Sequence, residues 1–359
     1  MSARQTGWIG VDVGTHAVKL AQVARQGGEV RLCGAAVIQR PESWSADSAL
    51  ALDQPATSRL EIRAARECGE FSGRNAVCLL PMNVCQMRSL GVPPGSDVER
   101  RTMIEDELAA EWSEQRVAME FDYWELESGF SDKASDGFNV NVMAVSRPWV
   151  GQLVSDCRHA GLDCWAIDGG PLAMARAVAL AGAAGGRRTL AVDWGYSNTT
   201  LCVVGEGRPW YTRRAGDCAY GAALEAIAGE FGVTLDQAQH LADAHGITNP
   251  TDHSPEYQAM QAGLTTAVRA ALDCLTAQIH RTLQFLEVQR RQLHPEAIWL
   301  MGGGASLRNL GRRLAHEFGL PVHVWKLPCE NSSPPCVAGD RAAIFAGAAA
   351  LSALAWRDS

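Results

Sequence analysis

The sequence lacks the patterns that mark disulfide-rich or nucleic-acid-binding proteins. It holds 11 cysteines but no Cys-x-x-Cys pair. An odd number of cysteines in a chain of 359 residues argues against a disulfide framework and for a reducing cytoplasm. No block of five or six like charges occurs and the net charge is −8, which argues against a basic, nucleic-acid-binding face.

Long apolar segments are also missing. The N-terminus has no apolar core of the kind found in signal peptides, so we expect no export signal. The most apolar stretch, residues 342–356, has 15 residues and is mostly alanine, which is too short to span a bilayer and predicts a packed final helix. Because 359 residues exceed what one compact core usually holds, two or more lobes are expected.

What the sequence does contain is an internal repeat. The segment "IGVDVGTHAVKLAQV" at residues 9–23 recurs as "LAVDWGYSNTTLCVV" at residues 190–204. Each copy has an apolar strand ending in Asp-x-Gly, a short polar turn and an apolar return strand, and a Gly-rich turn then leads to a third strand. The separation of 181 residues predicts two related halves that each open with a β-meander.

The two Asp-x-Gly hairpins have the chemistry of a phosphate site. A tight turn directs backbone N–H groups at an anion, and Gly14 and Gly195 allow close approach. Asp12 and Asp193 suit a hydrated Mg²⁺ ion, and Lys19 adds a positive charge. Further candidate phosphate ligands in the turns are Thr15, Ser197 and Asn198. Each hairpin alone is also readable as an ordinary amphipathic hairpin, but the repetition favours two hairpins that clamp a triphosphate.

A third segment, "AIWLMGGGASLRNLGRRLAHEFGLPVHVW", predicts a strand, a glycine turn, a helix and a second strand. Ser306 is expected to cap the helix. Gly302, Gly303 and Gly304 would let a ligand lie against the backbone at the helix N-terminus. The expected buried face is Leu307, Leu310, Leu314 and Phe318. The segment matches neither the Walker A pattern nor the dinucleotide fingerprint, and a purely structural loop is the alternative.

In this order, the three segments resemble the two phosphate motifs and the adenosine motif of the actin-like ATPase superfamily. The resemblance implies an α/β, two-lobed, ribonuclease H-like fold around ATP or ADP with Mg²⁺. The intervening sequence contains a strand ending in Leu80–Pro81, the Arg88-x-Leu90-x-x-Pro93 segment, the Asp122–Tyr123 strand, "VMAVSR" and Ala160–Leu162. With these features it resembles the PilM family of type IV pilus assembly.

The resemblance also implies a division of the chain, with a small α/β insertion like that of the cell-division protein FtsA. We expect 1–74 as the first lobe, 75–162 as the insertion, 163–188 as a helix completing the first lobe, 189–212 as the second hairpin, 213–256 as a small nucleotide-side subdomain and 257–359 as the rest of the second lobe. Helices are predicted from apolar spacing at Ile104, Leu108 and Trp112, at Val150, Leu153, Val154 and Cys157, and over residues 257–293.

Three positions depart from the pattern that the superfamily implies. Gly170 stands where relatives carry the Glu or Gln that orients the attacking water, and Asp168 is the nearest substitute carboxylate. Gln239 and Ala242 replace a Glu and a Lys that contact the nucleotide in relatives. Trp194 either packs in the lobe core or crowds the phosphate site. We therefore expect weak to moderate nucleotide binding and very slow or absent hydrolysis, with Asp193 and Asp168 as candidate catalytic carboxylates.

The expected function is a cytoplasmic nucleotide-binding scaffold of a type IV pilus or type II secretion platform. By resemblance, it binds the N-terminal peptide of a PilN-like inner-membrane protein, contacts the membrane only through that partner and binds no nucleic acid; self-association is left open. Residues 84–92 are read either as a wall of the peptide groove or as a buried strand.

Two other functional classes fit the sequence less well than the scaffold. A sugar kinase-like phosphotransferase needs an acceptor pocket and a catalytic carboxylate, for which no segment is convincing. A chaperone of the Hsp70 type needs a second domain, for which the sequence is too short.

Overall fold

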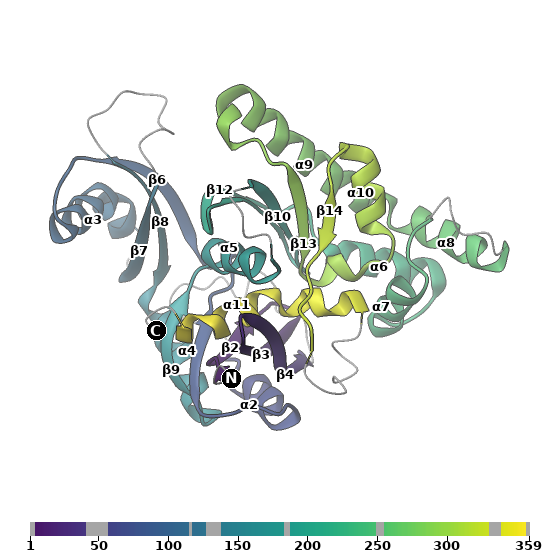
Figure 1. The fold of residues 1–359 in the computed structure, drawn as a ribbon, viewed down its shortest axis with the longest axis horizontal. Coiled ribbons are helices and arrows are strands. Elements are labelled where there is room, and N and C mark those ends of the chain that lie inside the picture. Colours follow the sequence, from purple (N-terminus) through teal and green to yellow (C-terminus); the bar gives the residue numbers. More distant parts are fainter. Residues whose placement is uncertain are drawn as a thin grey trace.

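The structure, a computed structural model, describes residues 4–40, 57–114, 117–126, 138–182, 187–248, 255–329 and 339–356. These residues form two large β-sheets and one small one. Helices pack between and around the two large sheets, and the small sheet lies at one side of the molecule with its own helix (Figure 1).

The first large sheet contains the N-terminal hairpin. Its strands are β1 (Gln5–Thr6), β2 (Ile9–Val13), β3 (Ala17–Gln26), β4 (Glu29–Gln39), β5 (Asn75–Leu79) and β9 (Asp163–Asp168). β2, β3 and β4 form an antiparallel meander, and β5 and β9 continue the sheet in parallel on the other side of β2. One face is covered by α2 (Arg59–Cys68) and α4 (Arg147–His159), which bury Ile62, Leu153 and Cys157.

The second large sheet repeats this arrangement. Its strands are β10 (Thr189–Trp194), β11 (Thr199–Gly205), β12 (Arg208–Ala215), β13 (Ala297–Met301) and β14 (Val322–Val324). The order β12-β11-β10-β13-β14 matches β4-β3-β2-β5-β9 strand for strand, with the same antiparallel and parallel pairings. The internal repeat and the two-lobed α/β fold predicted from the sequence are therefore confirmed.

The small sheet is antiparallel and has a hydrophobic core of its own. It consists of β6 (Gln86–Val92), β8 (Phe138–Ser146) and β7 (Met119–Leu126), in that order, with α3 (Asp97–Glu114) packed against it. Ile104 and Leu108 of α3 are buried in this core, as their spacing predicted. The expected insertion of residues 75–162 also contains β5 and α4, which belong to the sheet and core of the first lobe.

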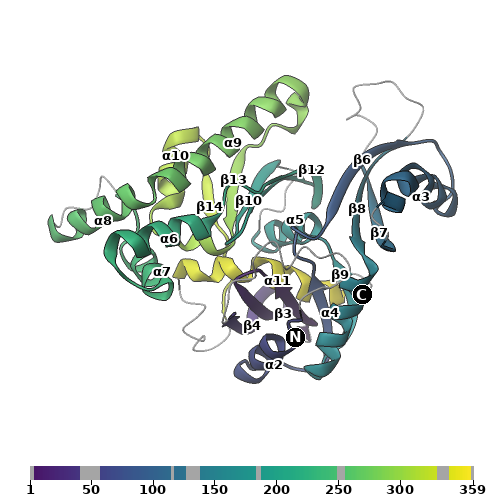
Figure 2. The same cartoon turned by 180° about the vertical axis from the view of Figure 1, so that it is seen from behind.

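Two apolar helices fill the space between the large sheets, as the front and back views both show (Figures 1 and 2). They are α5 (Gly170–Leu180) and α11 (Ala346–Ser352). A Cβ added at Gly10 of β2 would lie 1.8 Å from the carbonyl oxygen of Ala348, so α11 packs with its backbone directly on the sheet. Small residues are needed for such contact, which explains the alanine-rich C-terminal stretch as a packed helix.

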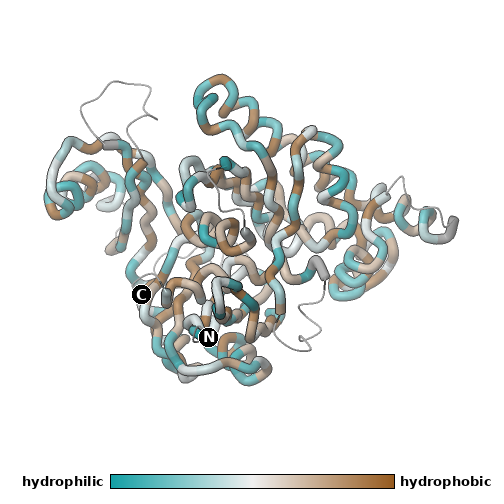
Figure 3. The backbone as a smooth tube through the Cα atoms, in the orientation of Figure 1, coloured by the Kyte–Doolittle hydropathy of each residue, from teal (hydrophilic) through white to brown (hydrophobic). Residues whose placement is uncertain are grey.

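The C-terminal stretch is not one continuous α-helix. The 3-10 helices η4 (Gly339–Phe345) and η5 (Ala353–Trp356) flank α11. Hydrophobic residues are concentrated on the central strands and on these inner helices, whereas the outer helices carry many hydrophilic residues (Figure 3).

The outer layer of the second lobe consists of helices. These are α6 (Tyr220–Phe231), α7 (Leu235–Ala244), α8 (Pro255–Ala267) and α9 (Arg269–Gln289), followed by the 3-10 turn η1 (Arg291–Leu293). The apolar spacing over residues 257–293 is thus resolved as two helices, which bury Leu264, Leu275, Ile279 and Leu286. No helix in the described ranges combines the length and apolar character needed to cross a membrane.

The segment after β13 differs from its prediction in one respect. A 3-10 turn, η2 (Gly303–Ser306), comes first, and α10 (Leu310–Phe318) begins only after Asn309. The Ser306 hydroxyl donates a 2.8 Å hydrogen bond to the Gly303 carbonyl, so it closes the glycine turn. The prediction that Ser306 caps the helix is therefore wrong, although α10 does end at Gly319 as expected.

Candidate functional site

The two Asp-x-Gly hairpins have the same backbone geometry. The Gly14 N–H donates to the Ala17 carbonyl and the Gly195 N–H donates to the Asn198 carbonyl, each at 3.0 Å. A Cβ at Gly14 would lie 2.8 Å from the Ala17 oxygen, and one at Gly195 would lie 3.0 Å from the Asn198 oxygen. Glycine is needed at both positions because the turn folds back so tightly on itself.

The tips of the two hairpins touch each other. The Thr15 hydroxyl donates to the Ser197 hydroxyl at 3.0 Å. The imidazole of His16 stacks on the Tyr196 ring with centroids 4.0 Å apart and planes 9° apart. Thr15 is equivalent to Tyr196 in the repeat, and His16 to Ser197, so the two contacts are related by the same pseudo-symmetry as the sheets.

Beneath these tips lies a cavity of about 440 Å³, within the usual size range of small-ligand sites. The predicted site residues that line it are Asp12, Gly14, Thr15, Lys19, Asp193, Gly195, Ser197, Asn198, Gly302, Gly303 and Ser306. Residues far apart in the sequence, on two hairpins and a glycine turn, thus converge on one cavity. Asp168 and Gly304, which were also predicted, are not among its lining residues.

The first hairpin carries an ion pair. Lys19 Nζ lies 2.8 Å from Asp12 Oδ2, and the two residues are cross-strand partners in the β2–β3 register. Burial by itself lowers the pKa of Lys19, but the neighbouring Asp12 carboxylate outweighs this and raises the pKa above its usual value. Lys19 therefore stays charged inside the cavity, where its ammonium group can bind an anion.

The second hairpin carries a carboxylate with no ion pair among the described residues. Asp193 is the equivalent of Asp12, but its cross-strand partner is Thr200 rather than a lysine. Burial raises the pKa of Asp193 to about 6, while the charge of Lys19 opposes this rise. A nearby cation would stabilise the charged form of this buried carboxylate.

The donor set fits a hydrated Mg²⁺ ion. Two carboxylates, Asp12 and Asp193, line one cavity and interact electrostatically. Mg²⁺ takes one or two carboxylates together with phosphate oxygens and keeps several of its waters. When bound here, it would neutralise phosphate charge that Lys19 alone leaves uncompensated.

The three glycines after β13 have different roles. Gly302 has φ 82° and ψ −177°, and an added Cβ would lie 2.1 Å from Asp193 Oδ1. The absence of a side chain at Gly302 therefore lets the glycine turn pack directly against the second hairpin. Gly304 instead packs on the ring of Trp194, where a Cβ would lie 2.3 Å away. Gly304 therefore makes room for a core side chain and does not face the cavity. Trp194 itself is 1% exposed and packs edge-on against Tyr220, so it fills the lobe core.

A polar network closes the cavity near the glycine turn. Gln239 Nε2 donates to Asp243 Oδ1 at 2.7 Å and to the Ser306 hydroxyl at 3.1 Å. Arg341 Nε lies 2.8 Å from Asp243 Oδ2 and also lines the cavity. Ala242 is fully buried and offers no polar atom in place of the expected lysine. Arg341 is then the cation nearest to this network, contributed by η4 rather than by α7.

On the side of the cavity next to α5, the described lining residues include no carboxylate. Gly170 lines the cavity, and a Cβ added there would lie 2.6 Å from the Met82 sulfur, so Met82 occupies the place of a side chain at 170. The carboxylate of Asp168 is held by Arg176 Nη1 and by the Gly169 N–H, each at 2.8 Å. Asp168 is thus engaged in a structural ion pair, which gives no support to its role as a substitute for the missing group.

Among the cavity residues that sequence reasoning missed are His16, Tyr196, Met82 and Arg341. The first two could have been found, because they occupy adjacent turn positions of the repeated hairpins. Met82 and Arg341 come from segments with no pattern of their own, and only the fold brings them to the cavity.

The comparisons with known proteins concern the family and the fold of the whole chain. Residues 10–333 match the family described as "Type IV pilus assembly protein PilM". A solved structure of a "PilM-PilN type IV pilus biogenesis complex" is similar with a TM-score of 0.72 and 21% identity, covering 97% of this chain and 98% of that one. The ethanolamine utilization protein EutJ from Carboxydothermus hydrogenoformans is similar with a TM-score of 0.51 and 13% identity, covering 97% and 89%. The chain belongs to the PilM family of type IV pilus assembly proteins, with the two-lobed fold of actin-like ATPases.

Proposed function

We propose that this protein is a nucleotide-binding scaffold at the cytoplasmic face of a pilus or secretion platform, and that it hydrolyses ATP very slowly or not at all. The observation that carries the proposal is the cavity between the two hairpins. It keeps the groups that bind phosphate and Mg²⁺, but it has Gly170 and Met82 where a water-orienting carboxylate or amide is needed.

Nucleotide binding is supported by three adjoining parts of the cavity. The turns at Gly14 and Gly195 offer backbone N–H groups, and Lys19 offers a charged donor to phosphate oxygens. Asp12 and Asp193 supply the carboxylates for Mg²⁺. The network of Gln239, Asp243, Ser306 and Arg341 lies at the adenosine end, where hydroxyl and amino groups of a nucleoside find both donors and acceptors.

Weak hydrolysis follows from the groups that are missing. Positioned acid–base groups contribute typically about 10²–10⁴-fold to a rate. Gly170 has no side chain, Asp168 is paired with Arg176, and Met82 is apolar. A bound ATP would therefore persist and hold the two lobes together, which suits a scaffold better than a cycling motor.

The proposed partner is the N-terminal peptide of a PilN-like membrane protein. Family membership and the similar PilM-PilN complex support this choice. We place the peptide at the open edge of the small sheet. There β6 pairs only with β8 among the described residues, and its Arg88, Ser89 and Gly91 are exposed. An extended peptide can add to such an edge by main-chain hydrogen bonds. Val84 and Cys85, just before β6, and Val92 at its end are buried, so the wall would be formed by the exposed middle of residues 84–92.

A peptide-binding assay tests the scaffold directly. Fluorescence anisotropy with the labelled N-terminal peptide of the PilN-like partner should show saturable binding. Proline is introduced singly at Ser89 and Leu90, because alternate residues of an edge strand direct their N–H groups outward. One of the two should lose binding at least about tenfold. The matched controls are proline at Asp122 and Tyr123 of β7, the opposite edge, which should bind normally.

The rival function, a sugar kinase, predicts the reverse outcome. It would show no peptide binding but transfer of labelled phosphate from ATP to a pool of sugars. That result would overturn the scaffold proposal while leaving the nucleotide cavity in place.

A further inference from the structure

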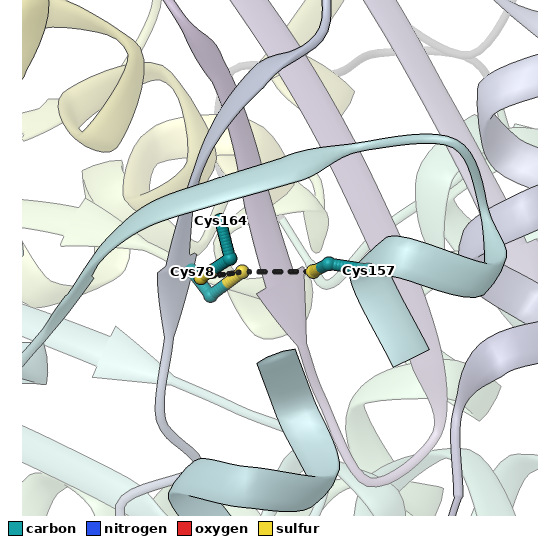
Figure 4. A group of neighbouring side chains, drawn as sticks. All are labelled: Cys78, Cys157 and Cys164. Atoms are coloured by element: carbon teal, nitrogen blue, oxygen red, sulfur yellow. Dashed lines mark hydrogen bonds between the residues drawn. The ribbon is translucent and has the colours of Figure 1, made fainter. Parts of the chain in front are cut away.

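A cluster of three cysteines lies outside the nucleotide cavity. Cys78 is on β5, Cys157 on α4 and Cys164 on β9, so the cluster joins two parallel strands to the helix that covers them. The Sγ atoms of Cys78 and Cys157 are 3.2 Å apart, those of Cys78 and Cys164 are 3.7 Å apart, and all three lie within 4.8 Å of one another. Figure 4 shows the Cys78 sulfur between those of Cys157 and Cys164, with a dashed line to each.

From this arrangement we propose that the three thiols form a binding site for a single soft, thiophilic cation, and that the ion is Cu(I). A three-coordinate ion with metal–sulfur bonds of about 2.3 Å separates its ligands by about 4 Å. The observed spacing needs only small side-chain shifts to reach that value.

The ligand set selects the ion. Among the described residues, the cluster that could hold a metal contains three cysteines and no histidine, aspartate or glutamate. Structural Zn²⁺ takes four ligands in a tetrahedron, so it would lack one here. Thiolate ligands suit Cu(I), Zn²⁺ and Fe–S clusters. Structural Zn²⁺ and Fe–S clusters take four such ligands, so a set of three favours Cu(I).

The burial of the three side chains gives the site an entry side. Cys78 and Cys157 are fully buried, whereas Cys164 is partly exposed. Cys164 is therefore the thiol that an entering ion reaches first. An ion arriving there displaces thiol protons as it moves inward.

The position of the cluster suggests what the ion would do. α4 follows directly on β8, the central strand of the small sheet, and Cys157 lies near the end of that helix. Binding would tie α4 to β5 and β9 and so hold the small sheet at a fixed angle to the first lobe. Every cysteine in the described part of the chain is a free thiol, so no disulfide competes for these sulfurs there.

The test is a competition titration under anaerobic conditions with the full chain. The background carries Cys68→Ser and Cys336→Ser, because Cys68 is exposed and Cys336 lies outside the described residues. Reduced protein is titrated with Cu(I) held by bathocuproine disulfonate. We expect one Cu(I) per chain to be withheld from the chelator, and the loaded protein to melt several degrees higher.

Variants locate the site. Cys78→Ser and Cys157→Ser should each lower the Cu(I) affinity at least a hundredfold, and Cys164→Ser, which changes the partly exposed member, should do the same with less cost to folding. The control is Cys202→Ser, a fully buried cysteine of β11, which should leave the titration unchanged. The proposal is overturned if the reduced protein withholds no copper, if Zn(II) binds more tightly than Cu(I), or if the ion remains in the Cys78 and Cys157 variants.

Discussion

The two Asp-x-Gly hairpins share their strand order, their turn hydrogen bonds and their contacts with each other, yet they differ in charge. In the first, Asp12 faces Lys19 across the strands; in the second, Asp193 faces Thr200. One hairpin is therefore an internally compensated ion pair and the other a buried carboxylate with a raised pKa. The repeat preserves the backbone of the two turns. In the proposed site, Lys19 of the first hairpin would bind the anion, and Asp193 of the second hairpin would bind the cation.

The largest expected effect on stability and affinity comes from substituting Gly302. This residue lies against Asp193 of the second hairpin. Gly302→Ala places a Cβ 2.1 Å from Asp193 Oδ1, in a backbone conformation that is nearly exclusive to glycine. We expect a loss of about 2–4 kcal/mol in the free energy of unfolding, measured in urea, and a loss of ATP affinity of at least about tenfold.

The matched control is Gly27→Ala in the β3–β4 turn. Gly27 also has a positive φ, 60°, but has no atom within 4 Å of its added Cβ. It should lose only about 1 kcal/mol and no affinity. Equal effects at Gly302 and Gly27 would mean that the contact with Asp193 is unimportant.

Making the first hairpin resemble the second tests the division of charge. Lys19→Thr copies Thr200 and removes the cation that faces Asp12. Because charge-assisted hydrogen bonds contribute about 1.5–3 kcal/mol, the affinity for MgATP measured by calorimetry should fall about 10–100-fold. Thr200→Ser, which changes the equivalent position conservatively, should alter affinity less than about threefold. An unchanged affinity in Lys19→Thr would contradict the assigned role of the first hairpin.

The raised pKa of Asp193 in the second hairpin should make the stability of the protein depend on pH. The folded-state pKa of Asp193 is about 6, above its usual value of 3.8, so the folded state holds this proton more tightly than the unfolded state. Stability from this group is present at low pH and is lost as pH rises through about 4 to 6. The melting temperature of Asp193→Asn relative to the wild type should therefore rise over that range in the ligand-free protein.

Asp12→Asn is the comparison for this experiment. It removes the partner of Lys19 and should lower the melting temperature at neutral pH. A melting difference between Asp193→Asn and the wild type that stays constant from pH 4.5 to 8 would argue against a raised pKa.

The smallest expected effect concerns the contact between the tips. His16→Ala removes the ring stacked on Tyr196, and aromatic pairs of this kind contribute about 0.5–1.5 kcal/mol. We expect ATP to dissociate about 2–10 times faster in a stopped-flow chase with unlabelled nucleotide. His16→Phe keeps a stacking ring and should restore the slow rate; if both variants dissociate alike, the stack does not hold the cavity closed.

The sequence predicted the parts of this fold that depend on local pattern. The repeated hairpins, the strand–glycine–helix–strand segment and the amphipathic helices α3, α4 and α9 all follow from apolar spacing and turn residues. It also predicted Gly170 as the decisive departure, because a missing side chain is visible in the sequence itself.

Other features depend on contacts between distant segments. No local pattern places Met82 over Gly170, Arg176 on Asp168 or Gly304 on Trp194. The predicted start of α10 is wrong because the Ser306 hydroxyl donates to Gly303 in the glycine turn. The same hydroxyl accepts a hydrogen bond from Gln239 of α7. Met82 and Arg341 were missed because tertiary packing alone brings them to the cavity, whereas His16 and Tyr196 could have been found from the repeat.

The most direct test of the account is a phosphate-release assay with purified protein, MgATP and the double variant Gly170→Glu/Met82→Ala. The account predicts that the wild type binds MgATP but releases almost no phosphate. The variant, which has a carboxylate and the space for it, should hydrolyse ATP at least about tenfold faster, and Met82→Ala alone should not. A wild-type turnover near one per second that disappears in Asp193→Ala would contradict the account.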